Sequence, residues 1–212
     1  MNFKTISVAS VMAVALTTAA ASAATLSLAG SGYLQQTLVG TYSLGSGGGV
    51  SIDYLTGDIK DGTNGLSLDG PAMVSYTYIG SEAGNRNYSM DAGGAQFNND
   101  TSSVNDGSGP FSAVAGLLKF LFGTSSPAGS VGVINNDGVA VQPSINYAIG
   151  YDVASDGQSA FLYFDDIAGG DRDFDDLVVK VSISAVPVPA AGFLLLAGLG
   201  GLAALKRRRA RS

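Results

Sequence analysis

The sequence predicts an all-β fold, an antiparallel β-sandwich or jelly-roll-like domain, and three observations support this prediction. Short runs rich in Tyr, Val, Ile and Thr are separated by clusters of Gly, Asn, Asp and Ser, as strands are separated by turns. Several runs alternate apolar and polar residues with the period of two that half-buried strands require. Strands and helices do not alternate regularly along the chain, which disfavours a parallel α/β sheet.

The expected strands are spread along the body of the chain. The early ones occupy residues 33–44, 50–55 and 73–79, with the turn sequences GSGGG and DGTNG nearby. Later strands are expected at 147–153, 160–164 and 177–184. The last of these is the clearest, because an apolar set of residues alternates along it with a second, mostly polar set. The second set is Val178, Lys180, Ser182 and Ser184. We expect the first set to face the core: Leu177, Val179, Val181 and Ile183.

The segment 111–122, FSAVAGLLKFLF, breaks the strand pattern. As a helix it would place its large apolar residues on one face, and it would then pack on the sheet. Gly116 weakens a helix, so a continuous buried strand is the alternative. The apolar residues concerned are Phe111, Val114, Leu117, Leu118, Leu121 and Phe122.

The composition excludes several classes of protein. The 212 residues contain no Cys and no His, which excludes Ser-His-Asp and Cys-His catalysis and the ordinary zinc, haem and iron–sulfur sites. Eleven basic residues against 17 acidic ones give a net charge of −6, so nucleic acid is not an expected partner. An exported domain without Cys has no disulfides, and its stability must come from its core or from a ligand that holds its loops.

Residues 1–23 have the pattern of a secretory signal peptide. Lys4 precedes an apolar run, and Ala21-Ser22-Ala23 is a cleavage site of the A-x-A type. We expect cleavage after Ala23 and export through the inner membrane. The alternative is an N-terminal helix that stays in the fold.

Residues 186–212 have the pattern of a membrane anchor. The segment from Val186 to Leu205 is apolar and about long enough to cross a bilayer. A basic cluster follows, and the positive-inside rule keeps it in the cytoplasm with the body outside. The alternative is a buried core helix with a solvated basic end. The cluster consists of Lys206, Arg207, Arg208, Arg209 and Arg211.

This C-terminal segment resembles a bacterial PEP-CTERM sorting signal. The motif Val186-Pro187-Val188-Pro189-Ala190 is followed by the apolar helix and the Arg-rich end, in the order of the variety named for Val-Pro-Leu-Pro-Ala. Val188 stands where that variety has Leu. The resemblance implies that an exosortase-type membrane enzyme cuts near the motif, after transient anchoring. The body then reaches the cell surface or the extracellular matrix, where exopolysaccharide is an implied partner.

The body, residues 24–185, has one dense acidic cluster. The sequence from 165 to 176 holds six Asp and one Arg, and extended residues two apart place carboxylates about 6–7 Å from one another. Repulsion per pair is about 0.6 kcal/mol in water and about 2.5 kcal/mol at a protein surface. A Ca²⁺ ion would offset it, because calcium takes 6–8 oxygen ligands. The candidate ligands are Asp165, Asp166, Asp171, Asp173, Asp175 and Asp176.

An ordinary turn is the competing interpretation of the cluster. Asp side chains accept hydrogen bonds from turn amides, and the remaining charge can be solvated or can guard a sheet edge. The cluster is not an EF-hand, since the Gly at the sixth position and the Glu at the twelfth are absent.

The acidic segment also resembles the end of a domain of unknown function from bacterial secreted proteins. That resemblance covers about residues 130–184 and implies an extracellular β domain in which calcium binding is suspected. It brings no established activity. The matching residues are Phe164, Asp166, Gly169, Gly170, Asp171, Asp173, Phe174, Asp176, Leu177 and Val178.

The sequence favours a non-catalytic surface or matrix protein over two alternatives. The first alternative is a calcium-dependent carbohydrate-binding module, in which Tyr88 and Phe97 stack on sugars. Asn85, Asn87, Asn98 and Asn99 would supply its polar contacts, although turn chemistry and core aromatics explain the same residues. The second is an unrecognised hydrolase with paired carboxylates. With 16 Asp in the body, such a pair is expected by number alone, and we predict no catalytic residues.

Overall fold

The fold is known from a computed structural model. It describes residues 23–38, 50–56, 63–125, 131–136, 147–166, 172–187, 197–201 and 206–207. Within these ranges strand is the main secondary structure, and every strand pair is antiparallel. The prediction of an all-β fold is therefore confirmed.

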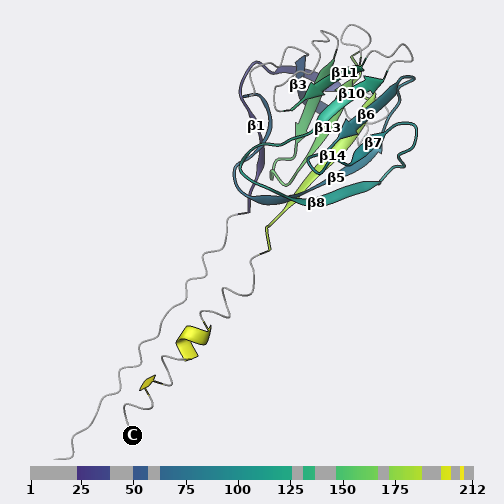
Figure 1. The fold of residues 1–212 in the computed structure, drawn as a ribbon. Helices are drawn as coiled ribbons and strands as arrows, with labels where there is room; N and C mark the ends of the chain where they lie inside the picture. Colours follow the sequence, from purple (N-terminus) through teal and green to yellow (C-terminus); the bar gives the residue numbers. More distant parts are fainter. Residues whose placement is uncertain are drawn as a thin grey trace, which may run out of the picture.

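The strands form three antiparallel sheets (Figure 1). The large sheet has the order β2-β3-β12-β13-β14-β5-β8, with bounds Leu34–Leu38, Val50–Thr56, Ala148–Val153, Ser159–Asp165, Leu177–Ser184, Ala72–Gly80 and Gly107–Ala113. The second sheet has the order β11-β10-β6-β7, with bounds Val131–Asn135, Leu121–Ser125, Arg86–Met90 and Gln96–Asn98. The third has the order β1-β4-β9, with bounds Leu26–Ala29, Gly65–Leu68 and Gly116–Leu117.

The main core lies between one face of the large sheet and the two smaller sheets, in a sandwich-like arrangement. Val74, Tyr151 and Leu162 of the large sheet belong to the same buried cluster as Leu66 of β4 and Phe122 of β10. Phe122 and Phe164 stack with their ring centroids 5.3 Å apart. Residue alternation within the strands is what allows one face of each sheet to enter this layer.

Asn136 links the two smaller sheets. Its side chain is buried; Nδ2 donates to the carbonyls of Leu66 (2.9 Å) and Leu118 (2.6 Å), and Oδ1 accepts from the Leu66 amide at 2.7 Å. A side chain at Gly65 would collide with Asn136, since an added Cβ would lie 2.1 Å from Oδ1. Gly65 also has a φ of +133°, which favours glycine.

The large sheet carries a second apolar cluster on its other face. Ile52, Tyr54 and Tyr163 belong to it, together with Val178 and Phe174. The expectation that only alternate residues of β14 are buried is therefore wrong at Val178, which is covered on this second face. The other apolar residues expected to face the core do so, with Ile183 half-buried near the strand's end.

The expected helix at 111–122 is wrong, and so is the continuous strand. The segment contains the end of β8, the short strand β9 and the start of β10. Gly116 has a φ of +120° and interrupts the extended chain. Beyond it the burial follows a period of two through Leu118, Phe120 and Phe122, whereas Val114 is 79% exposed.

Most of the two terminal segments lies outside the described residues. This includes Ala21, the residues 188–190 of the sorting motif, and Arg208, Arg209 and Arg211 of the basic cluster. Of the rest, Ala23 is exposed, and residues 197–201 and 206–207 are helical. Within the part of the chain that is described, no helix combines the length and the apolarity needed to cross a membrane.

Candidate functional site: an acidic end and an adjoining polar cleft

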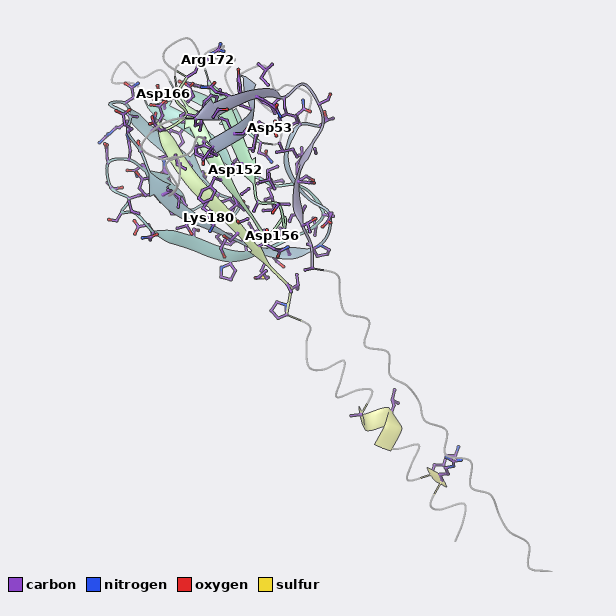
Figure 2. All side chains as sticks on the ribbon, turned by 180° about the vertical axis from the view of Figure 1, so that it is seen from behind. Asp53, Asp152, Asp156, Asp166, Arg172 and Lys180 are labelled. Carbon is purple, nitrogen blue, oxygen red and sulfur yellow. The ribbon has the colours of Figure 1, made fainter. Side chains whose placement is uncertain are left out.

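The hairpin of β13 and β14 places the acidic segment at one end of the domain. Asp165 is the last residue of β13, and Asp176 directly precedes β14. Figure 2 shows Asp166 and Arg172 at the end of the domain away from the point where β14 finishes. Two strands of the large sheet therefore deliver the Asp residues to one end of the sandwich.

Phe174 anchors this segment to the large sheet. Its side chain is fully buried and packs on Tyr54, with the ring centroids 5.1 Å apart. Arg172 and Phe174 both have positive φ, 53° and 59°, so the segment is kinked. The carboxylate spacing expected for an extended segment therefore does not apply here. The carbonyl of Arg172 accepts a hydrogen bond of 2.5 Å from Gln36 Nε2 on β2. An apolar residue within the acidic sequence thus holds the loop in place.

Two carboxylates of the segment are buried. Asp165 is 1% exposed and Asp166 is 6% exposed. Asn87 Nδ2 donates to Asp166 Oδ2 at 2.7 Å, and Asn85 Nδ2 lies 3.2 Å from the same oxygen. Thr124 in turn donates to Asn87 Oδ1 at 2.5 Å. Both amides are neutral donors, so they satisfy hydrogen bonds of the Asp166 side chain without pairing it with a positive charge.

Asp176 has a strongly perturbed acidity. Burial, and after it the negative charges of Asp166, Asp165 and Asp173, raise its pKa to about 7. The backbone amide of Asp166, which donates to Asp176 Oδ2 at 2.7 Å, acts in the opposite direction. The ionised form of Asp176 is therefore disfavoured, both by its partial burial and by the like charge of its neighbours.

A second group of carboxylates lies close by. One oxygen each from Glu82, Asp173 and Asp175 lies within 4.8 Å of the other two. The backbone amide of Glu82 donates to the carbonyl of Asp175 at 2.9 Å. The sequence did not predict Glu82 as a metal ligand. Glu82 lies beside this segment because it follows β5, and β5 pairs with β14. A candidate based on spacing along one segment cannot include such a long-range neighbour.

Among the described residues, two of the predicted metal ligands, Asp173 and Asp175, lie with Glu82 in a group close enough to share one ion. Asp165, Asp166 and Asp176 form the inner group, while Asp173 and Asp175 form the outer group with Glu82. Asp171 lies outside the described residues. Carboxylate and backbone oxygens are the ligands that calcium prefers. Turn-type hydrogen bonds, such as that of Asp166 N–H to Asp176, are present as well.

The predicted sugar-binding residues are separated by the fold. Phe97 is buried and stacks on Tyr78, so it is not available to a ligand. Asn87 also turns inward, toward Asp166. Tyr88 and Asn98 instead line a polar cleft of about 240 Å³ beside β6 and β7.

Comparison of the chain with known protein families, curated proteins and solved structures finds no significant match. Fold and site together define an antiparallel β-sandwich-like domain with a buried acidic end and a polar surface cleft.

Proposed function

We propose that the chain is an exported, non-catalytic protein of the cell surface or extracellular matrix. In this account residues 1–23 are a signal peptide and residues 186–212 are a sorting signal for an exosortase-type enzyme, with a transient membrane helix. The body, residues 24–185, carries 5 basic and 17 acidic residues and so a net charge of −12. A body of this charge suits an aqueous exterior and repels nucleic acid.

The observation that carries this proposal is where the two ends of the domain lie. Gln158 Nε2 donates to the carbonyl of Ala24, and the Gln158 carbonyl accepts from the amide of Ile183. The first and last parts of the domain therefore meet at one end, and the acidic residues lie at the opposite end (Figure 2). A domain held by a C-terminal helix would present its acidic end away from the membrane.

Calcium is the proposed cofactor of that acidic end. Asp165 and Asp166 are buried, and Asp166 lies beside a neutral amide. The elevated pKa of Asp176 reflects burial first and then repulsion by neighbouring carboxylates, and a divalent cation would offset both effects. In a domain without disulfides, a cation bridging the segment before β14 to Glu82 after β5 would hold two loops together.

The intact mass of the mature protein recovered from cells tests export and sorting. We expect an N-terminus at Ala24 and a C-terminus between Pro187 and Ala190. A chain that keeps Met1 contradicts export. A mature chain that keeps its Arg-rich end contradicts sorting and leaves a plain membrane anchor.

The second candidate function is a calcium-dependent carbohydrate-binding module. The observation that favours it is the polar cleft beside β6, whose lining includes Tyr88 and Asn98. Asn87 connects this cleft to the acidic end, because it belongs to the cleft lining and donates to Asp166.

A further inference from the structure

The cleft lies over the outer side of the β6–β7 pair. Along β6 the side chains of Asn87 and Ser89 are buried, whereas Arg86 is exposed and Tyr88 is partly exposed. Tyr88 is paired directly with Asn98 of β7. Because alternate residues of a strand face opposite sides, Arg86, Tyr88 and Asn98 share the outer face. With Gln96, Asp100 and Thr101 they line the 240 Å³ cleft.

The polar groups of the cleft are held in place before any ligand arrives. Asn98 Oδ1 accepts from the backbone amides of Asp100 (3.1 Å) and Thr101 (2.8 Å) and from Thr101 Oγ1 at 2.8 Å. This fixes the turn after β7. Asn99 Oδ1 binds the backbone amide of Asn87 at 3.0 Å, which ties the same turn to β6. Pre-organisation of this kind lowers the entropic cost of binding.

The charge of the cleft is balanced. Arg86 Nε donates to Asp100 Oδ2 in an ion pair across its rim. Burial raises the pKa of Tyr88, so its hydroxyl stays neutral and can both donate and accept. A ligand therefore meets amides, hydroxyls, a neutralised ion pair and part of an aromatic ring. It does not meet a free positive charge on these residues.

We propose that this cleft binds a single ring or chain end of a neutral polysaccharide. Sugar hydroxyls both donate and accept hydrogen bonds, which matches the amides of Gln96 and Asn98 and the paired charges of Arg86 and Asp100. The C–H face of a sugar ring is apolar and suits the partly exposed ring of Tyr88. A volume of about 240 Å³ is below the range of about 300–1,000 Å³ for drug-sized ligands, and it fits a small ligand.

The same observations argue against anionic ligands. The one cation that lines the cleft, Arg86, is already paired with Asp100. A polyanion would have to break that pair and to approach a body with a net charge of −12, counted from 5 basic and 17 acidic residues at 24–185. The proposal deepens the second candidate function by naming the site and the ligand class.

The test measures binding of the purified full-length chain to immobilised polysaccharides. The neutral arm is dextran, mannan, galactan and β-glucan, and the anionic arm is alginate and heparin, each in calcium and in chelator. We expect binding to at least one neutral glycan and none to the anionic ones. Tyr88→Ala should weaken that binding about three- to tenfold, the value of one aromatic contact.

Gln96→Ala is the second variant, and Gln35→Ala is its matched control. Both glutamines are exposed on strands, and Gln35 lies on β2, outside the cleft lining. Gln96→Ala should lower the affinity, and Gln35→Ala should not. Absence of binding to every neutral glycan, binding to the anionic arm alone, or equal affinity of wild type and both cleft variants would overturn the proposal. Export and sorting are measured by mass and do not depend on this result.

Discussion

Asp176→Asn in the calcium-free protein provides the sharpest test of the acidic end. Burial and the charges of Asp166, Asp165 and Asp173 raise the pKa of Asp176 from 3.8 to about 7. A raised folded-state pKa means that the native protein binds the proton more tightly than the unfolded chain. The associated stability is fully present below about pH 4 and is lost as the pH rises through about 7.

The expected magnitude follows from this shift. About three pH units at about 1.4 kcal/mol each give about 4 kcal/mol. The Asp176 carboxyl is only partly buried, so solvent screening reduces this to about 2 kcal/mol. Asn keeps an oxygen that can accept the Asp166 amide hydrogen, now donated to Asp176 Oδ2. It removes the charge, and we therefore expect Asp176→Asn to stabilise the calcium-free protein at pH 8 by about 2 kcal/mol.

The assay is urea unfolding in chelator between pH 4.5 and 8. Wild type should lose about 2 kcal/mol of its free energy of unfolding across this range relative to Asp176→Asn. Asp156→Asn is the control, because Asp156 is exposed at the other end of the domain (Figure 2). Parallel pH profiles for wild type and Asp176→Asn would refute the reasoning.

Two further substitutions test the packing that positions the site. Gly150→Ala would bring a Cβ within 2.5 Å of Ile52 Cδ1 and 3.2 Å of Phe174 Cδ1, so it should lower the free energy of unfolding by about 1–3 kcal/mol. Gly84→Ala has open space and should leave the thermal midpoint unchanged; equal effects of the two would contradict the packing account. Asn136→Ala removes the side-chain partner of the Leu66 amide and of the Leu118 carbonyl, and it leaves the Leu66 carbonyl with the Leu118 amide as donor. It should cost at least about 2 kcal/mol in a urea titration. A loss below about 0.5 kcal/mol would show that Asn136 does not hold the two small sheets together.

The strands β5 and β14 were predictable because their signal is local, whereas β1, β4, β6, β7 and β11 were not among the expected strands. In β5 and β14 apolar residues recur with a period of two, and Gly, Asn and Asp clusters mark the turns. The segment at 111–122 misled the prediction, since apolar residues spaced for a helix also fit short strands once Gly116 takes a positive φ. Val178 was misplaced because the sequence does not show that the large sheet is covered on both faces.

The acidic site was predictable only where it is contiguous in sequence. Asp165, Asp166 and Asp176 flank one hairpin loop, so their proximity follows from the strands around them. Glu82 and Asn87 come from the region that follows β5, about 80–90 residues earlier. Phe174 belongs to the acidic sequence, yet its burial depends on Tyr54 across the sheet. These contacts depend on the pairing of strands that are distant in the sequence, so the spacing of residues within one segment cannot predict them.

The measurement that tests the acidic end most directly is the thermal unfolding midpoint of the full-length chain in calcium and in chelator. Extracellular calcium modules bind with Kd of about 10⁻⁴–10⁻³ M, so about 10 mM calcium should stabilise the fold by about 1.4–2.7 kcal/mol. That corresponds to a rise of about 3–10 °C, which Asp173→Asn with Asp175→Asn should abolish, because these two carboxylates form the candidate ion site with Glu82. A midpoint that is the same in calcium and in chelator would contradict the calcium site and leave the cluster as a hydrogen-bonded turn.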